Sequence, residues 1–317
     1  MGGSPGKSLF RLVNMAEPPK RPPKFNCYAN YIVERSQGRL LDPQREALQK
    51  LQKFFEQNPG GRIGLVSMPT GSGKTGVISC LPFFLGRLND SVFDKPVLVI
   101  APDLTIAKQL EGELLVSPNA PGKNFLLKRE IVPHGHQRDI VPKGTKIEET
   151  KYVINEEFLT SNDVIIANAQ KFLRDGWEDV LPDDLFKLVI VDEAHHHPAR
   201  TWRRIIEKFR NHSMVAFFTA TPFRADGQLV VHDQEGQLVY HLSLEDARTM
   251  RIIRRINWHP LHSEDTELGN IFKLILEQVK SIQQAKDDED PLPDNIPHMA
   301  IAITPNNTVY AEQVAEI

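Results

Sequence analysis

Two short motifs carry residues that could bind and cleave a nucleoside triphosphate. The first, Met68 to Thr75 (MPTGSGKT), follows an apolar run, precedes residues with helical spacing, and has Met68 where the general pattern has a glycine. Glycines in such a turn let backbone N–H groups point at phosphate oxygens, and the following helix N-terminus adds partial positive charge. The lysine supplies a charge for the β- and γ-phosphates, and the hydroxyl after it can bind Mg²⁺. The predicted phosphate-binding loop therefore consists of Thr70, Gly71, Ser72, Gly73, Lys74 and Thr75.

The second motif places two carboxylates after an apolar run. Asp192 and Glu193 follow residues 188–191 (LVIV), which have the composition of a buried strand. An aspartate in this position can hold Mg²⁺, and a neighbouring glutamate can orient and polarise an attacking water molecule. Asp-Glu after an apolar run is common by itself, but together with the upstream loop it is a strong signal. We therefore predict that Lys74, Asp192 and Glu193 are catalytic and that Thr75 and Asp192 bind Mg²⁺.

Apolar runs that alternate with helical patterns would position these motifs. Amphipathic spacing predicts helices beginning near Leu41, where Asp42 would be the cap, at Leu104 and at Thr201. Strands separated by helices form a parallel sheet covered on both faces, and ligands bind beyond the carboxyl ends of its strands. The sequence therefore predicts an α/β fold with both motifs at one edge of the sheet. The runs predicted to be buried strands are residues 63–67, 97–101, 164–167, 188–191 and 215–218.

Composition divides the chain into three parts. Residues 1–38 include a proline-rich stretch and are predicted to be a disordered tail. Residues 39–243 contain both motifs and the predicted α/β domain, with a hairpin over residues 230–240. Residues 244–317 are predicted to be a linker and the incomplete beginning of a second domain. The elements expected in this last part are a helix over 267–283, a strand over 298–303 and a helix over 308–317.

Overall composition narrows the class of protein. The chain has 317 residues, of which 40% are hydrophobic and 25% are charged, and this is ordinary globular composition. No run approaches the roughly 18 apolar residues of a membrane span. The formal net charge of −3 means that the protein as a whole is not a basic nucleic-acid binder. This charge is still compatible with a local basic face. Two cysteines provide neither a disulfide framework nor a zinc set, so we expect an intracellular protein, cytoplasmic or nuclear, without membrane association. A mitochondrial presequence is a minor alternative, because basic residues precede the first acid, Glu17.

The two motifs together resemble those of superfamily 2 helicases of the DEAH-box type. Residues 69–75 (PTGSGKT) and 192–195 (DEAH) carry the resemblance, and residues 219–227 (TATPFRADG) are typical of one group within it. That group contains the type III restriction translocase subunits and related DNA repair helicases. The specific motifs cover about residues 40–250. The resemblance implies a RecA-like P-loop NTPase domain followed by the start of a second RecA-like domain.

The resemblance also implies roles for residues outside the phosphate-binding loop. Gln44 matches the glutamine that recognises adenine, although it could be an ordinary residue of an N-terminal helix turn. His195, Thr219 and Thr221 match residues that couple the state of ATP to the bound strand. The run His195–His197 is not expected to bind metal, because three adjacent histidines cannot all converge on one ion.

Nucleic-acid contacts are implied at two further strand ends. Gln109 could instead be an ordinary surface residue of a helix, and Asn168 and Gln170 could be helix caps. Contacts to the phosphate backbone would make binding tolerant of sequence and sensitive to salt. The positions that match backbone-contacting motifs are Pro102, Gln109, Asn168 and Gln170.

Together these features predict an ATP-dependent helicase or translocase that uses Mg²⁺ and moves along a nucleic acid, with DNA favoured over RNA. In the family, the second domain supplies an arginine that is worth about 10³–10⁵ in rate. Only the beginning of that domain is recognisable, so we expect the chain as given to bind ATP and Mg²⁺ but to hydrolyse ATP slowly and not to unwind. One alternative is a nucleotide-dependent nucleic-acid sensor or scaffold. Another is a P-loop ATPase of a different kind, against which Gln44 and Thr219–Thr221 argue.

Overall fold

The structure is a computed structural model, and the chain divides into two units, Met1–Arg254 and Arg255–Ile317. Nearly all of the residues that the structure describes belong to the first unit. The strand and the last helix predicted in the second unit lie outside the described residues, and so does all but residues 277 and 281 of the predicted helix over 267–283. The described residues are 24–88, 93, 95–116, 123–133, 135–147, 159–169, 177–196, 200–223, 227–232, 234–253, 277 and 281.

The described part of the first unit is built on a parallel sheet. Its seven strands lie in the order β3-β4-β2-β5-β6-β1-β7, and every neighbouring pair is parallel. Because strands that are neighbours in space are separated in sequence by helices, the predicted α/β class with a parallel sheet between helices is confirmed. The strands are β1 (Ile63–Ser67), β2 (Val97–Ala101), β3 (Gly144–Lys146), β4 (Val164–Asn168), β5 (Leu188–Val191), β6 (Met214–Thr219) and β7 (Gly236–His241).

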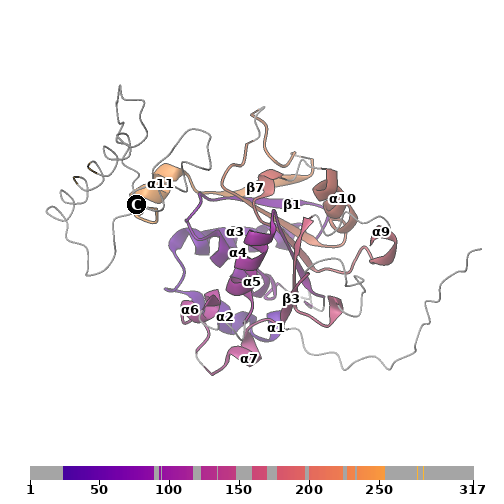
Figure 1. Cartoon of the computed structure of the whole chain (residues 1–317), viewed down its shortest axis with the longest axis horizontal. Coiled ribbons are helices and arrows are strands. Elements are labelled where there is room, and N and C mark those ends of the chain that lie inside the picture. Colours follow the sequence, from indigo (N-terminus) through magenta and orange to yellow (C-terminus); the bar gives the residue numbers. More distant parts are fainter. Residues whose placement is uncertain are drawn as a thin grey trace, which may run out of the picture. The chain divides into compact units, whose positions relative to one another are not determined.

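Helices cover both faces of this sheet (Figure 1). Residues of α2 to α6 share one buried cluster with alternate strand residues, and residues of α10 share a second cluster with the others. The helices described are α1 (Lys24–Cys27), α2 (Ala29–Ser36), α3 (Asp42–Gln57), α4 (Lys74–Leu85), α5 (Leu104–Leu114), α6 (Phe125–Lys128), α7 (Gln137–Ile140), α9 (Trp177–Val180), α10 (Arg200–Phe209) and α11 (Leu244–Thr249), with a short 3-10 helix at Ala194–His196.

Strand β2 shows how the sequence builds two hydrophobic layers. Val97 and Val99 face the cluster that contains α3 and α4, whereas Leu98 and Ile100 face the cluster that contains α10. All five residues of β2 are buried, because helices pack on both sides. Successive side chains of a strand point to opposite faces, so a strand buried on both faces must be apolar throughout. This explains why the central strands are recognisable as uninterrupted apolar runs.

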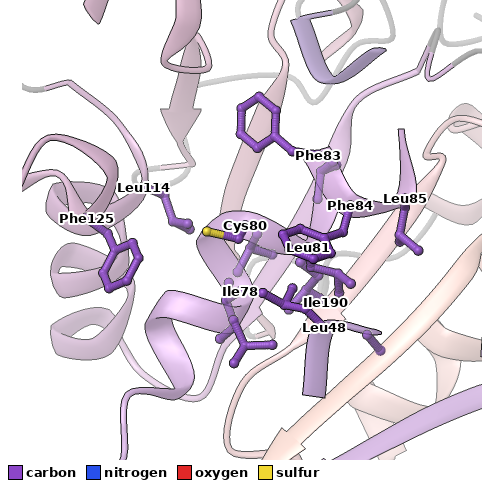
Figure 2. Packing of buried hydrophobic residues seen from close by; sticks show 14 of the residues in the cluster. Leu48, Ile78, Cys80, Leu81, Phe83, Phe84, Leu85, Leu114, Phe125 and Ile190 are labelled. Atoms are coloured by element: carbon purple, nitrogen blue, oxygen red, sulfur yellow. The ribbon is translucent and has the colours of Figure 1, made fainter. Parts of the chain in front are cut away.

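Helix α4 fixes the position of the phosphate-binding loop. Every residue of α4 except Thr75 is buried. Its side chains pack between α3, α5, α6 and the sheet, where Cys80 and Leu81 lie among Leu48, Leu114 and Ile190 (Figure 2). A helix that is apolar all round can rotate or slide only by exposing hydrophobic surface. The burial of α4 therefore holds its first residue, Lys74, at the carboxyl end of β1.

The N-terminal segment is ordered over part of the region predicted to be a tail. Residues 24–36 form α1 and α2, so the prediction of disorder was wrong there, while residues 1–23 lie outside the described residues. Phe25 packs edge-on against Phe83 at 5.1 Å and against Phe93 at 5.2 Å between ring centroids. The nearby prolines suggested a tail, but Phe25, Ile32 and Val33 are buried in the hydrophobic cluster that contains α4.

The segment predicted to be a hairpin contains only one strand of the main sheet. Strand β7 lies parallel to β1, with Ile63 opposite Gly236, and the backbone amides of Glu235 and Gly236 bond back to the His232 carbonyl in a turn. Val230 and Val231 are buried in the hydrophobic cluster that contains α10 and have no antiparallel partner in β7. The prediction of a hairpin was therefore wrong, because the apolar pair Val230 and Val231 packs in the core and does not pair with β7. Among the described residues, the structure contains no helix that is long and apolar enough to cross a bilayer.

Candidate nucleotide site

The phosphate-binding loop connects β1 to α4 and is held in shape by its own backbone. Gly71 and Gly73 have φ angles of 81° and 91°, in the left-handed region that favours glycine. Ser72 is fully buried, and both its amide and its hydroxyl donate to the Pro69 carbonyl, the hydroxyl at 2.6 Å. Thr70 and Gly71 are exposed. The side chain of Ser72 therefore shapes the loop, while the exposed rim of the loop can meet a ligand.

Lys74 brings its ammonium group to the carboxylates that follow β5. Its Nζ atom lies 3.2 Å from Oε1 of Glu193 and donates to the Met68 carbonyl at 3.3 Å. Lys74 is only 9% exposed, so its charge needs these partners. The structure thus brings together the loop lysine and the predicted water-orienting glutamate.

Asp192 is a buried carboxylate at the end of β5. It is 8% exposed, and its Oδ1 atom accepts the Glu193 amide at 3.0 Å. Burial raises the pKa of Asp192 from 3.8 to about 6, with a further contribution from the charge of Glu193, and Lys74 opposes this change. A buried carboxylate whose charge is disfavoured is a good ligand for a hard divalent cation, which would stabilise the charged form. Thr75, the other predicted Mg²⁺ ligand, is half-buried in the first turn of α4.

Glu193 has a backbone conformation that is uncommon for its residue type. Its φ angle is 49°, in the left-handed region, where a residue with a Cβ is disfavoured by about 1–2 kcal/mol. This conformation accompanies contacts of its carboxylate on two sides, Oε1 to Lys74 and Oε2 to Nδ1 of His195 at 3.4 Å. Backbone strain of this kind concentrates at functional sites, where surrounding contacts maintain it.

A hydrogen-bonded chain continues from Glu193 to the end of β6. Nδ1 of His195 lies 3.2 Å from Oγ1 of Thr219, which is fully buried. That hydroxyl accepts the Thr221 amide at 3.1 Å and lies 3.2 Å from the Thr221 carbonyl. A hydroxyl has one proton and two acceptor lone pairs, so donation to the Thr221 carbonyl leaves Oγ1 to accept a hydrogen bond from the Nδ1–H group of His195. His195 in its Nδ1–H form therefore joins the carboxylate of Glu193 to the loop after β6.

Gln44 lies in the first turn of α3, and its side chain contacts the phosphate-binding loop. Its Oε1 atom accepts the Leu41 amide at 2.9 Å, and its Nε2 atom donates to the Gly73 carbonyl at 2.8 Å. The helix begins with Asp42, and Leu41 holds the capping position, so the prediction that Asp42 is the cap was wrong. The side chain of Gln44 takes over the capping function because its amide oxygen reaches back to Leu41.

The residues predicted to contact nucleic acid lie in three different environments. Pro102 and Asn168 are at neighbouring strand ends, since β2 pairs with β4 and Ala101 lies opposite Asn168. Asn168 is 3% exposed, whereas Gln109 is exposed on α5. Gln170 lies outside the described residues. The two strand ends thus share the sheet edge that carries the phosphate-binding loop. Of the three predicted residues that the structure describes, only Gln109 has an exposed side chain.

Sequence reasoning overlooked Gly76 and Phe125, which surround the side chain of Gln44. A Cβ atom at Gly76 would lie 2.5 Å from Nε2 of Gln44 and 2.6 Å from Cζ of Phe125. An isolated glycine inside a helix pattern indicates close approach of another group, and this signal was present two residues after Lys74. Phe125 gave no such signal, because its contact with Gln44 and Gly76 joins residues that are far apart in the sequence.

Comparison with known proteins identifies the family. Residues 37–224 match the family model described as "Type III restriction enzyme, res subunit". No curated protein matches the chain. One similar solved structure is a nuclease-deletion mutant of the Type ISP restriction-modification enzyme LlaGI with a DNA substrate mimic, with 16% identity, a TM-score of 0.47, and coverage of 80% of this chain and 23% of that one. Another is a hypothetical ATP-dependent RNA helicase from Sulfolobus tokodaii, with 18% identity, a TM-score of 0.41, and coverage of 62% and 51%.

The matches differ in how much of each protein they cover. The chain spans 23% of the length of the first structure and 51% of the second. The family match covers more than half of the 317 residues and includes every predicted site residue from Gln44 to Thr221. This chain therefore belongs to the helicase-like family of type III restriction enzyme Res subunits.

Proposed function

We propose that this chain provides the ATP-binding motor domain of a nucleic-acid-dependent ATPase that translocates along DNA. The observation that carries the proposal is the 3.2 Å contact between Nζ of Lys74 and Oε1 of Glu193. It joins a cation suited to the γ-phosphate to a carboxylate suited to the attacking water. The family membership supports the same reaction class, and the family's description as a restriction enzyme favours DNA over RNA.

In the proposed reaction, the γ-phosphate of ATP competes with Glu193 for the ammonium group of Lys74. Charge developing on the transferred phosphoryl group is then stabilised by Lys74 and by backbone amides of the loop other than that of Ser72, which donates to Pro69. Once Lys74 has exchanged partners, the carboxylate of Glu193 is released to orient water. When bound, Mg²⁺ would neutralise part of the phosphate charge, and Thr75 and Asp192 are the residues that would hold it. The burial and raised pKa of Asp192 fit that assignment.

The contacts of His195 support a coupling role in this proposal. Glu193 contacts Nδ1 of His195, and the same nitrogen reaches Thr219, whose hydroxyl holds the backbone of Thr221. A change in the contacts of Glu193 would thus affect the loop after β6 through only two side chains, those of His195 and Thr219. We propose that Pro102, Gln109, Asn168 and Gln170 contact the nucleic-acid backbone. Contacts of this type would make binding sequence-tolerant and sensitive to salt.

The proposal is tested by ATP turnover with and without single-stranded DNA, with RNA of the same sequence as the comparison. We expect slow turnover by this chain, stimulation by DNA above that by RNA, and loss of turnover in Glu193→Gln with ATP binding retained. ATP binding without any DNA-stimulated turnover would instead favour a nucleotide-dependent sensor. Turnover that is unchanged in Glu193→Gln would contradict the proposed role of Glu193.

A further inference from the structure

We propose that the ring of Phe223 forms a stacking platform for one nucleobase of the bound nucleic acid. Phe223 would thereby add a base contact to the backbone contacts of the proposed function, on which this inference rests. Stacking uses the flat π face that every base has, so the platform would accept any of the bases. The contact is therefore expected to tolerate any sequence but to require that a base is present.

Phe223 is the one phenylalanine with an exposed side chain in the part of the chain that the structure describes. It is 57% exposed, whereas each of the other described phenylalanines is buried. Because burial of a large aromatic side chain stabilises a fold, the folded chain forgoes this gain at one position. Four large hydrophobic side chains are exposed among the described residues, and only that of Phe223 has a flat π surface. The other three are Leu104, Leu244 and Met250.

Phe223 belongs to the segment that leaves the sheet beside the phosphate-binding loop. Strand β6 ends at Thr219, which lies opposite Ser67 at the end of β1, just before that loop. Pro102 and Asn168, for which backbone contacts are proposed, lie at the ends of β2 and β4 on the same edge. The sheet order β4-β2-β5-β6 means that a nucleic-acid strand that continues along these strand ends passes the end of β6 as well.

The backbone at Phe223 is fixed by contacts with the returning segment. The carbonyl of Pro222 accepts the Val230 amide at 2.8 Å, and Phe223 forms an antiparallel bridge with Leu229. Val230 is buried in the hydrophobic cluster that contains α10. A ring carried by a fixed backbone has little conformational freedom to lose on binding, so the contact is preorganised.

The exposed residues close to Phe223 in the chain do not extend the apolar surface of its ring. Thr221, Gly227 and Gln228 are exposed, and none of them has a large hydrophobic side chain. A stable protein interface buries about 800 Å² on each partner, which a single ring cannot supply. One ring does match the size of one base, so these surroundings favour a nucleobase over a partner protein.

The test measures the affinity of the chain for single-stranded DNA with and without bases, by fluorescence anisotropy. One DNA of about 20 nucleotides, longer than typical single-strand sites, carries ordinary bases. A second DNA of equal length has an abasic tetrahydrofuran residue at every position, so both DNAs present phosphates at every step. Phe223→Ala removes the ring, and Phe223→Tyr keeps it. Met250→Ala is the matched control, because Met250 is also apolar and 54% exposed but follows α11.

We expect the wild-type chain to bind the DNA with bases more tightly than the abasic DNA. Phe223→Ala should weaken binding of the DNA with bases by about tenfold and leave binding of the abasic DNA unchanged, because a stack is lost only where a base is present. Phe223→Tyr and Met250→Ala should bind both DNAs as the wild type does. The inference is overturned if Phe223→Ala weakens both DNAs equally or weakens neither.

The wild-type comparison needs no variant, so it can overturn the inference even if Phe223→Ala does not fold. Equal affinity of the wild-type chain for the two DNAs would leave the proposed backbone contacts standing and overturn only the base contact of Phe223. If the wild-type chain binds neither DNA, the proposed function itself is wrong, and the inference about Phe223 falls with it.

Discussion

Lys74 and Glu193 meet across an intervening strand, with Nζ of the lysine 3.2 Å from Oε1 of the glutamate. Lys74 follows β1 and Glu193 follows shortly after β5, and β6 lies between these two strands in the sheet. The sequence predicted that both motifs lie at one edge of the sheet, and β6 separates the two strands that carry them. Because second neighbours in a sheet are about 9.5 Å apart, only long side chains can close the distance.

Shortening the side chain at residue 193 should therefore move its carboxylate away from Lys74. We expect Glu193→Asp to lower the rate of ATP hydrolysis by about 100-fold, because a displacement of about 1 Å is enough for a loss of this size. The measurement is single-turnover hydrolysis at saturating ATP, with Glu193→Gln as the variant that keeps the length and loses the charge. Wild-type turnover by Glu193→Asp would show that the reach of Glu193 is irrelevant.

Asp192 should make the stability of the ligand-free protein depend on pH. Its pKa is raised from 3.8 to about 6, chiefly by burial, so the folded state binds more protons than the unfolded state between these values. The stability of the wild type therefore falls as pH rises through that window. Asp192→Asn removes the titration, and we expect it to be more stable than the wild type above about pH 6 by up to about 3 kcal/mol.

This effect of Asp192 is measured by thermal unfolding at pH 4, 5, 6 and 7 in the presence of a chelator and without nucleotide. Asparagine retains an oxygen that can accept the Glu193 amide, so the comparison isolates the charge. The advantage of Asp192→Asn should grow with pH. An advantage that is constant or that shrinks with rising pH would contradict the burial of an ionised carboxylate.

The buried hydroxyl of Thr219 should couple nucleotide hydrolysis to nucleic-acid binding. Thr219→Val removes the acceptor for the Thr221 amide and the contact with His195, and we expect a loss of about 1–2 kcal/mol in the free energy of unfolding. Thr219→Ser keeps the hydroxyl and is the matched control. Stimulation of ATP turnover by DNA should be lost in the valine variant and retained in the serine variant. Equal stimulation of ATP turnover by DNA in both variants would contradict the coupling role of this hydroxyl.

The N-terminal helices should stabilise the motor domain. Phe25 is buried between Phe83 and Phe93, so Phe25→Ala should lower the free energy of unfolding by about 3–5 kcal/mol. Cys27 belongs to the same helix but is exposed, and Cys27→Ser should change stability by less than about 0.5 kcal/mol. Chemical denaturation measures both changes. A small effect of Phe25→Ala would mean that α1 is not part of the hydrophobic core in solution.

The central strands could be predicted from sequence because each one is buried on both faces. Residues such as Val97 to Ala101 form unbroken apolar runs, and the loops after them therefore stood out. The edge strand β3 (Gly144–Lys146) was missed, since its three residues are only half-buried and have no apolar pattern. Phe25 was missed for another reason. Its contacts come from residues far along the chain, and nothing local distinguishes it from the proline-rich residues before it.

The candidate site was predictable to the extent that its residues occur in motifs. The two motifs led to the prediction of Lys74, Asp192 and Glu193, and the structure places Lys74 next to Glu193. The environment of Gln44 could not be predicted, because it depends on two glycines in another element and on Phe125 from a third. Motifs specify residue types at a site, whereas the partners of a side chain depend on tertiary packing.

The most direct test of the triphosphate site is the affinity of ATP with Mg²⁺ for the wild-type chain and for Lys74→Ala. Lys50→Ala is the control, because Lys50 has a half-exposed side chain and lies on α3. At a ligand concentration of about 100 times the dissociation constant, binding should stabilise the wild type and the control by about 2.7 kcal/mol. Lys74→Ala should show no stabilisation by ATP. Equal stabilisation of Lys74→Ala and the wild type would contradict the assignment of Lys74 to a triphosphate site.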